Sequence, residues 1–272
     1  MKSSALTLTA RHLVLVIFAV AFLIPFVGIV LAAVQSGQVN GFALPEAWEW
    51  GNFARAWEEG HFSDLMVSSL IIVSLVVPTA IVLSVLAGYG LAVIRPKGNT
   101  VITSAFVVGL TLPTELVVIA LYYQLGSLGL TNNYIGIALA EVALFLPFGV
   151  FWMSTHFSGI PRELVESGRI DGARDFRVLW SLLMPISWPA VTTLAVLLFV
   201  WAWNQFLIVL VLMQSPTKRT ATAGLGFFVG EFSTDVPLLA AASLIVITPV
   251  IVVYLIFQRS FVNGITQGAV KG

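Results

Sequence analysis

Residues 13–34 read LVLVIFAVAFLIPFVGIVLAAV, an apolar run without a charged side chain. A helix of about 20 apolar residues is long enough to cross the hydrocarbon core of a bilayer. The apolar segment of a signal peptide measures about 7–15 residues, so this run is too long to be one. The sequence therefore predicts a first membrane helix that is retained in the mature protein.

Five further apolar runs follow this one along the chain. They cover residues 65–94, 101–123, 134–155, 182–213 and 237–261. Hydrophobic residues make up 58% of the 272 residues and charged residues 10%, whereas soluble domains carry roughly a quarter charged residues. Spans in lipid must satisfy their own backbone hydrogen bonds, and no alternating pattern of a barrel is present. The sequence predicts an all-α polytopic membrane protein with six transmembrane helices in a single domain over residues 1–272.

The basic residues are distributed unevenly between the two sides of these spans. If the six spans alternate in direction, three basic residues fall on one side, namely Arg55, Lys218 and Arg219. The other ten fall on the opposite side: Lys2, Arg11, Arg95, Lys97, Arg162, Arg169, Arg174, Arg177, Arg259 and Lys271. Cytoplasmic loops are enriched in Lys and Arg. Both termini and the 158–181 loop are therefore predicted to be cytoplasmic.

The first outer loop combines acids with aromatic residues. The acids are Glu46, Glu49, Glu58, Glu59 and Asp64, and the aromatic residues are Trp48, Trp50, Phe53, Trp57 and Phe62. This composition suits a short helix at the membrane surface. It is predicted to act either as an anchor in the lipid headgroups or as a docking surface for a partner.

Charge and composition exclude several other function classes. The formal net charge is zero, so no global field favours nucleic acid. The chain has no cysteine, which excludes disulfides and thiolate sites. His12, His61 and His156 lie in separate segments, so a histidine metal site has little support and no metal is expected.

Residues 160–173 read IPRELVESGRIDGA and lie in the longest cytoplasmic connection. Pro161 suits the first turn of a helix, and Glu163 and Glu166 complement the dipole at that end. Gly172 suits the left-handed residue that ends a helix. The loop therefore predicts a short surface helix, a glycine turn, and a second helix from about Asp175.

The same loop resembles the signature of ABC importer permeases, written as Glu-Ala-Ala, three residues, Gly, nine residues, Ile-x-Leu-Pro. The fixed positions correspond to Glu166, Gly172, Leu182, Met184 and Pro185, with Ser167 and Gly168 replacing the two alanines. The run at 170–173, the pair Trp203-Asn204 and the ending at 268–272 are similar to the carbohydrate-uptake, maltose-type branch, also described as binding-protein-dependent transport inner membrane components.

This resemblance implies a type I importer transmembrane domain whose loop docks on an ATP-binding subunit. The residues implied to couple the two are Glu163, Glu166, Ser167, Gly168, Asp171, Gly172 and Ala173. It further implies a homologous sister permease, two copies of the ATP-binding subunit and an extracytoplasmic binding protein that delivers a carbohydrate. The chain contains no Gly-x4-Gly-Lys-Ser/Thr phosphate loop, so ATP and Mg are expected in the partner subunits and the chain is not expected to be an enzyme.

Polar residues inside the spans are candidates for the substrate pathway. They are Glu115, Glu141, Asn204 and Gln205, with Tyr122 and Trp201 as aromatic surfaces for a sugar ring. Polar residues in the membrane usually face a bundle interior or a water-filled cavity, and straight-helix geometry places these toward the outside. The alternative is that they hydrogen-bond between helices and hold the bundle together.

Two other functions compete with this interpretation. An ion-coupled secondary transporter would use Glu115 and Glu141 as proton carriers, but no inverted halves are visible and the permease loop is present. An intramembrane enzyme would need a nucleophile and a base within the spans, and His156 has no matching serine motif.

Overall fold

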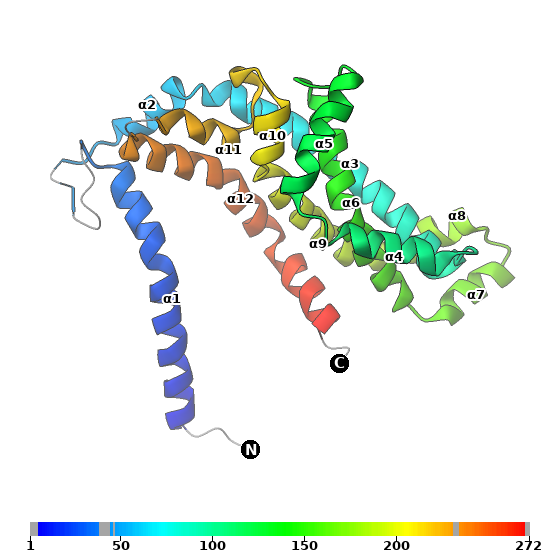
Figure 1. Ribbon diagram of the computed structural model, residues 1–272. Coiled ribbons are helices and arrows are strands. Elements are labelled where there is room, and N and C mark those ends of the chain that lie inside the picture. The colour runs from blue at the N-terminus through cyan, green and yellow to red at the C-terminus, as the bar shows by residue number, and fades with distance from the viewer. Residues whose placement is uncertain (1–4, 38–43, 46, 231–233, 270–272) are drawn as a thin grey trace. The chain divides into compact units, whose positions relative to one another are not determined.

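The structure is a computed structural model that describes residues 5–37, 44–45, 47–230 and 234–269, with the backbone alone at 5–10 and 259–269. Lys2, Glu46, Lys271 and the last residues of the predicted family ending lie outside the described residues. Within the described residues the chain is helical and contains no strand (Figure 1). The helices in chain order are α1 Ala5–Ala33, α2 Gly51–Glu59, α3 Phe62–Tyr89, η1 Gly90–Ile94, α4 Asn99–Gly109, α5 Thr114–Ser127, α6 Tyr134–Ser158, α7 Arg162–Ile170, α8 Asp175–Arg177, η2 Val178–Leu183, α9 Met184–Trp203, α10 Leu207–Leu212, η3 Pro216–Lys218, α11 Ala221–Gly224, η4 Leu225–Phe228 and α12 Val236–Ala269.

Five helical segments in the described part of the chain are long and apolar enough to cross a membrane. They are Arg11–Ala33, Phe62–Ile94, Tyr134–Ser158, Asp175–Trp203 and Val236–Gln258. The pair α4 and α5 passes the same test together and is bent by 101° at its break. Counting this pair as one span gives the six predicted crossings, so the predicted all-α membrane fold is confirmed.

The third span is bent, whereas its depth was predicted from a straight helix over 101–123. Pro113 has φ −70° and ψ 132°, an extended conformation that changes the direction of the chain between α4 and α5. A proline lacks the N–H that a continuing helix would need. Glu115 consequently lies in the first turn of α5, and the straight-helix estimate of its depth does not apply.

The fifth span was predicted at 182–213, and both of those limits are wrong. The helical segment begins at Asp175 and ends at Trp203, and α10 is a separate short helix. At the lower end, η2 is a π-helical turn directly before Pro185, where a wider turn relieves the clash between a proline ring and the preceding carbonyl groups. At the upper end, Asn204 ends α9, and its Nδ2 donates to the Val200 carbonyl oxygen at 2.8 Å.

The chain divides into two compact units. One comprises residues 1–63 and 224–248, and the other comprises residues 64–223 and 249–272. The prediction of a single permease domain stays a prediction. The larger unit contains the hydrophobic core, whose fully buried side chains include Ile72, Ile137, Met153, Leu183, Leu194, Leu198, Ile208 and Leu212.

Helix α6 is central to the larger unit, where it packs against η1, α4, α9 and α10. Gly88 allows α3 to approach α6 closely, because an added Cβ would lie 2.7 Å from Met153 Cβ and 2.9 Å from the Ser154 backbone nitrogen. Small residues at such positions are typical of helix contacts in membranes. Between α6 and α9, Trp152 Nε1 donates to the Ala190 carbonyl oxygen at 3.0 Å. These contacts fix the two helices that flank the 158–181 loop.

In the smaller unit, α2 confirms the short helix predicted for the outer loop. Asn52 is buried, and its Nδ2 donates to the carbonyl oxygens of Ala33 at 3.0 Å and Gln35 at 2.9 Å. These bonds satisfy carbonyl groups that the end of α1 leaves without helical partners. Trp48 and Trp50 are exposed and stacked, with ring centroids 6.2 Å apart. Their predicted role as an anchor or a docking surface stays a prediction.

Candidate functional site

The connection between α6 and α9 contains the predicted surface helix, α7. Pro161 precedes it in an extended conformation with φ −55° and ψ 131°, and Glu163 lies in its first turn. Proline at this point loses no helical hydrogen bond, and an acid near the start of a helix is favoured by the dipole. The predicted short helix and the position of Glu163 in its first turn are confirmed, whereas Pro161 lies directly before the first turn and not within it.

Gly172 ends α7 as predicted, with φ +81°. The Ala173 N–H donates to the Gly168 carbonyl at 2.9 Å, and the Gly172 N–H donates to the Arg169 carbonyl at 3.0 Å. This pair of bonds is the Schellman motif, in which a left-handed residue closes the last turn. An added Cβ at Gly172 would meet nothing within 4 Å, so the requirement for glycine comes from the backbone conformation and not from crowding.

One side of α7 is packed and the other is free. Val165 and Gly168 are buried, and α7 packs on η2. An added Cβ at Gly168 would overlap Leu182 Cδ1, so an alanine there would require the end of the Leu182 side chain to move. The exposed residues on the free side are Glu163, Glu166, Ser167, Ile170 and Asp171. An apolar residue, Ile170, is 86% exposed among these acids.

A three-residue network joins α7 to its surroundings, and the sequence did not predict it. Asp175 Oδ1 accepts hydrogen bonds from Arg169 Nη2 at 2.9 Å and from the Tyr89 hydroxyl at 3.1 Å. The hydrogen bond from Arg169 to Asp175 raises the pKa of Arg169 above its ordinary value, so the guanidinium stays charged. Arg169 and Asp175 face each other across the glycine turn, a proximity that six residues of separation alone does not indicate.

A second polar contact joins the two membrane helices that flank the loop. His156 Nε2 lies 3.0 Å from Ser187 Oγ, with His156 in the last turn of α6 and Ser187 buried in α9. No spacing motif predicts this pair, since its members are 31 residues apart. The contact therefore joins α6 to α9 close to the loop that connects them.

The predicted substrate-pathway residues lie on α5, on α6, and at or just after the end of α9. Helix α6 packs on α5, α9 and α10, and α5 also packs on α10. Trp201 is half-buried, and its ring lies 4.8 Å from that of Phe148 and 5.8 Å from that of Phe145, measured between centroids. Gln214 Nε2 donates to the Tyr122 hydroxyl at 3.5 Å. Glu115 and Asn204 are exposed and Gln205 is half-buried.

Glu141 differs from the other pathway candidates because it is fully buried in α6. Neither of its carboxylate oxygens has a hydrogen-bond partner among the described residues. Polar residues in the spans were expected to face the bundle interior or a water-filled cavity, and Glu141 lies in the interior, so its place in the substrate pathway stays a prediction. Burying an acid without a hydrogen-bond partner costs free energy. Glu141 is therefore an exception to the rule that buried polar groups are hydrogen-bonded.

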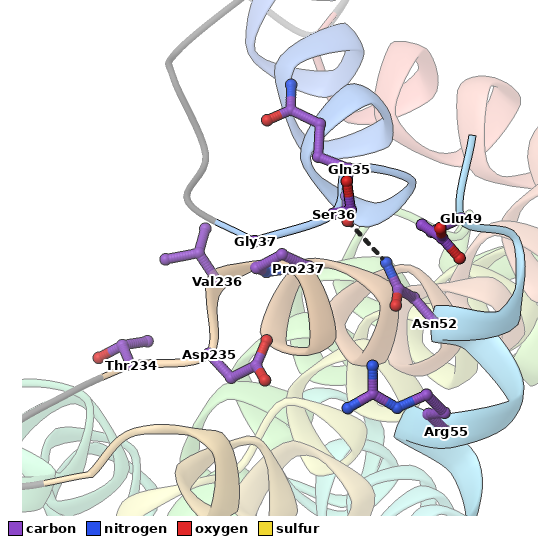
Figure 2. Close-up of a pocket in the computed structure, with 10 residues that line it drawn as sticks. All are labelled: Gln35, Ser36, Gly37, Glu49, Asn52, Arg55, Thr234, Asp235, Val236 and Pro237. Carbon is purple, nitrogen blue, oxygen red and sulfur yellow. Dashed lines mark hydrogen bonds between the residues drawn. The ribbon is translucent and has the colours of Figure 1, made fainter. Parts of the chain in front are cut away.

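A pocket of about 810 Å³ lies elsewhere, in the smaller unit (Figure 2). Its lining residues are Gln35, Ser36, Gly37, Glu49, Asn52, Arg55, Thr234, Asp235, Val236 and Pro237, none of which was predicted as a site residue. The polar groups there have local partners: Arg55 pairs with Glu59 at 3.4 Å, and Asp235 Oδ1 accepts from the Leu238 N–H at 3.1 Å at the start of α12. The pocket therefore lies where the end of α1, α2 and the start of α12 meet.

Comparison with known proteins decides the family. The sequence model of the family described as "Binding-protein-dependent transport system inner membrane component" matches residues 80–267, which include α7 and both π-helical turns. The chain belongs to this family. As a permease component it is a membrane-embedded transport subunit, and the predicted relationship to ABC importer permeases is confirmed.

Relatives of this permease match most of its length. The diacetylchitobiose uptake system permease protein NgcG of Streptomyces coelicolor is 29% identical over 96% of this chain and 88% of its own. The trehalose/maltose transport system permease protein MalG of Thermococcus litoralis is 33% identical over 78% of this chain and 77% of its own. In a bacterial ABC transporter involved in the import of the acidic polysaccharide alginate, one chain has the same fold, with a TM-score of 0.81, 22% identity, and coverage of 96% of this permease and 98% of that chain.

We expect Gly172→Val to loosen the end of α7. A β-branched residue in a left-handed conformation costs at least about 1–2 kcal/mol. Trypsin should therefore cleave after the exposed Arg174 faster than in the wild-type complex, while Gly172→Asn, a residue that tolerates this conformation, should show a smaller increase. Equal cleavage rates in the Val variant and the wild type would contradict the assignment of Gly172 as the residue that closes α7.

Proposed function

We propose that this permease is one of two homologous transmembrane subunits of an ABC importer for a sugar, an oligosaccharide or a related polyol. The substrate class is supported by the relatives, which include uptake permeases for diacetylchitobiose and for trehalose and maltose. The half-buried aromatic rings of Trp201, Phe145 and Phe148 add support, since aromatic faces suit sugar rings.

The observation that carries the proposal is the geometry of α7. The helix is closed by a Schellman turn, packed on η2, and presents Glu163, Glu166, Ser167 and Asp171 on its free side. A short rigid helix with acids and an exposed apolar residue fits a basic-edged groove of a partner. We propose that this groove belongs to the ATP-binding subunit. Gly168, Gly172 and Ala173 then shape and seat the helix instead of contacting the partner.

The proposed assembly contains this permease, a homologous sister permease, two copies of the ATP-binding subunit and an extracytoplasmic binding protein. ATP and Mg bind in the ATP-binding subunits, where hydrolysis takes place. The binding protein is supported by the family description and by a fold relative, with TM-score 0.69, from an alginate ABC transporter in complex with an alginate pentasaccharide-bound periplasmic protein. This permease itself would form one half of the pore, within one domain.

We propose an orientation in a bacterial cytoplasmic membrane with both termini and α7 in the cytoplasm. The support is the distribution of basic residues, ten of which lie on the α7 side of six alternating spans. Lipid surrounds the exposed apolar side chains of α1, such as Leu15, Phe18 and Phe22, unless the sister permease covers them. This orientation places α7 where ATP is available.

For the substrate pathway we propose alternating access through the region of α5, α6 and α9. Glu141 is enclosed here, and a rearrangement of α6 against its neighbours would expose its carboxylate to the pathway. Glu115, Asn204 and Gln205 would supply further polar groups, and Tyr122 and Trp201 would supply aromatic faces. Family membership supports this mechanism over an ion-coupled secondary transporter.

We expect Glu166→Ala to abolish the coupling of transport to ATP hydrolysis. Truncating one member of a buried interfacial charge pair costs about 2–5 kcal/mol. Glu166 is exposed within this permease, so its removal should change the stability of the subunit by less than about 0.5 kcal/mol. The measurement is substrate-stimulated ATP hydrolysis and uptake in the reconstituted complex, with the exposed Lys218→Ala on η3 as the control. Wild-type coupling in Glu166→Ala would refute α7 as the docking element.

We expect Glu141→Gln to lower uptake on the order of tenfold, because in the proposed cycle the exposed carboxylate hydrogen-bonds the substrate, and a hydrogen bond to a charged group is worth about 1.5–3 kcal/mol. The amide has nearly the same size as the carboxyl group, so assembly of the complex should persist. Glu115→Gln provides the comparison from α5. Unchanged uptake kinetics in both variants would assign these residues to the structure of the bundle alone.

A further inference from the structure

The Arg169, Asp175 and Tyr89 network lies outside the fixed positions of the family signature. The fixed positions of that signature correspond to residues 166–168, 172, 182, 184 and 185, so Arg169 and Asp175 stand at its variable positions and Tyr89 lies outside it. Asp175 Oδ1 is shared by Arg169 Nη2 at 2.9 Å and the Tyr89 hydroxyl at 3.1 Å. One oxygen atom therefore connects α7, α8 and α3.

Tyr89 is held in place on the membrane side of this network. It is the last residue of α3, it is 4% exposed, and its ring contacts that of Phe157 edge to face at 6.2 Å. Phe157 lies in the last turn of α6. Because the ring is packed, its hydroxyl has a fixed position, and a displacement of the Asp175 carboxylate must either move Tyr89 or break the hydrogen bond.

The network gives α7 a second mechanical connection to the membrane helices. The first connection runs through η2, on which α7 packs and which continues into α9. The second runs through Asp175 to Tyr89, directly before the π-helical turn η1. Both connections meet the apolar helical segments at π-helical turns, which are frequent at functional sites.

The exposure of the ion pair argues for a role beyond stability. The side chains of Arg169 and Asp175 are 47% and 51% exposed. Exposed ion pairs contribute little to folding, because water and salt screen them. The contact that packing holds in place is the hydrogen bond from the buried Tyr89 to the shared carboxylate, which connects α7 and α8 to the end of α3.

We propose that Tyr89, Asp175 and Arg169 are positioning residues that make α3 follow α7 during the transport cycle. This inference rests on the proposed function of α7 as the element that docks on the ATP-binding subunit. Movement of α7 reaches α9 through η2 and reaches α3 through the network, so the two membrane helices shift together. Without the network, ATP hydrolysis continues but moves less substrate.

The test uses the complete transporter in proteoliposomes and measures substrate transported per ATP hydrolysed. Asp175→Ala and Tyr89→Phe should each lower this ratio on the order of tenfold, because each removes a hydrogen bond to a charged group. The double variant should be no worse than either single variant. Arg169→Ala should lower the ratio, and Arg169→Lys, which keeps a cation beside Asp175, should restore it. The control is Arg177→Gln, an exposed cation on α8, which should leave the ratio unchanged.

Three results would overturn the proposal: a wild-type ratio in Tyr89→Phe, additive losses in the double variant, or losses fully explained by a lower yield of assembled complex. Glu166→Ala is measured in parallel to separate the two proposals. If Glu166→Ala stops coupling while the network variants behave as wild type, the network alone is refuted. If Glu166→Ala has no effect, the docking function of α7 is refuted whatever the network variants show.

Discussion

In hydrocarbon, every backbone N–H and C=O group needs a partner within the protein, and the rest of this structure depends on that constraint. It makes the spans helical, and it restricts breaks to places where other groups compensate. The break after α9 is compensated by Asn204, whose side chain bonds a carbonyl of the last turn. At η2 the helix widens before Pro185 instead of breaking. The end of α1 is satisfied by the buried Asn52.

Local signals in the sequence predicted the elements that local physics controls. The limits of the first, second and fourth spans agree with the structure within a few residues, and α7 with its Gly172 turn lies where proline, acid and glycine placed it. The errors arose where apolar runs conceal breaks. Residues 204–206 separate α9 from α10 but are too few to interrupt a long hydrophobic stretch, and hydropathy does not report the bend at Pro113.

Contacts between distant residues could not be predicted in this way. Tyr89 and Asp175 are 86 residues apart, and Trp201 meets Phe148 only because α6 packs on α9. The burial of Glu141 was equally inaccessible, since an acid in a span predicts water or a partner and the structure shows an enclosed carboxyl group instead. The contacts and burial of these residues depend on tertiary packing, and the sequence pattern does not determine that packing in detail. They also include the residues that the proposed mechanism uses in addition to those of the family signature.

The central claim is that the free side of α7 meets an ATP-binding subunit. The most direct measurement places a photoreactive amino acid at Ile170, which is 86% exposed, in the assembled transporter, with Leu116 on α5, 75% exposed, as the comparison site. The account predicts that the probe at Ile170 crosslinks to the ATP-binding subunit and that the probe at Leu116 does not. Crosslinks from Ile170 to lipid or to the sister permease, with none to the ATP-binding subunit, would contradict it.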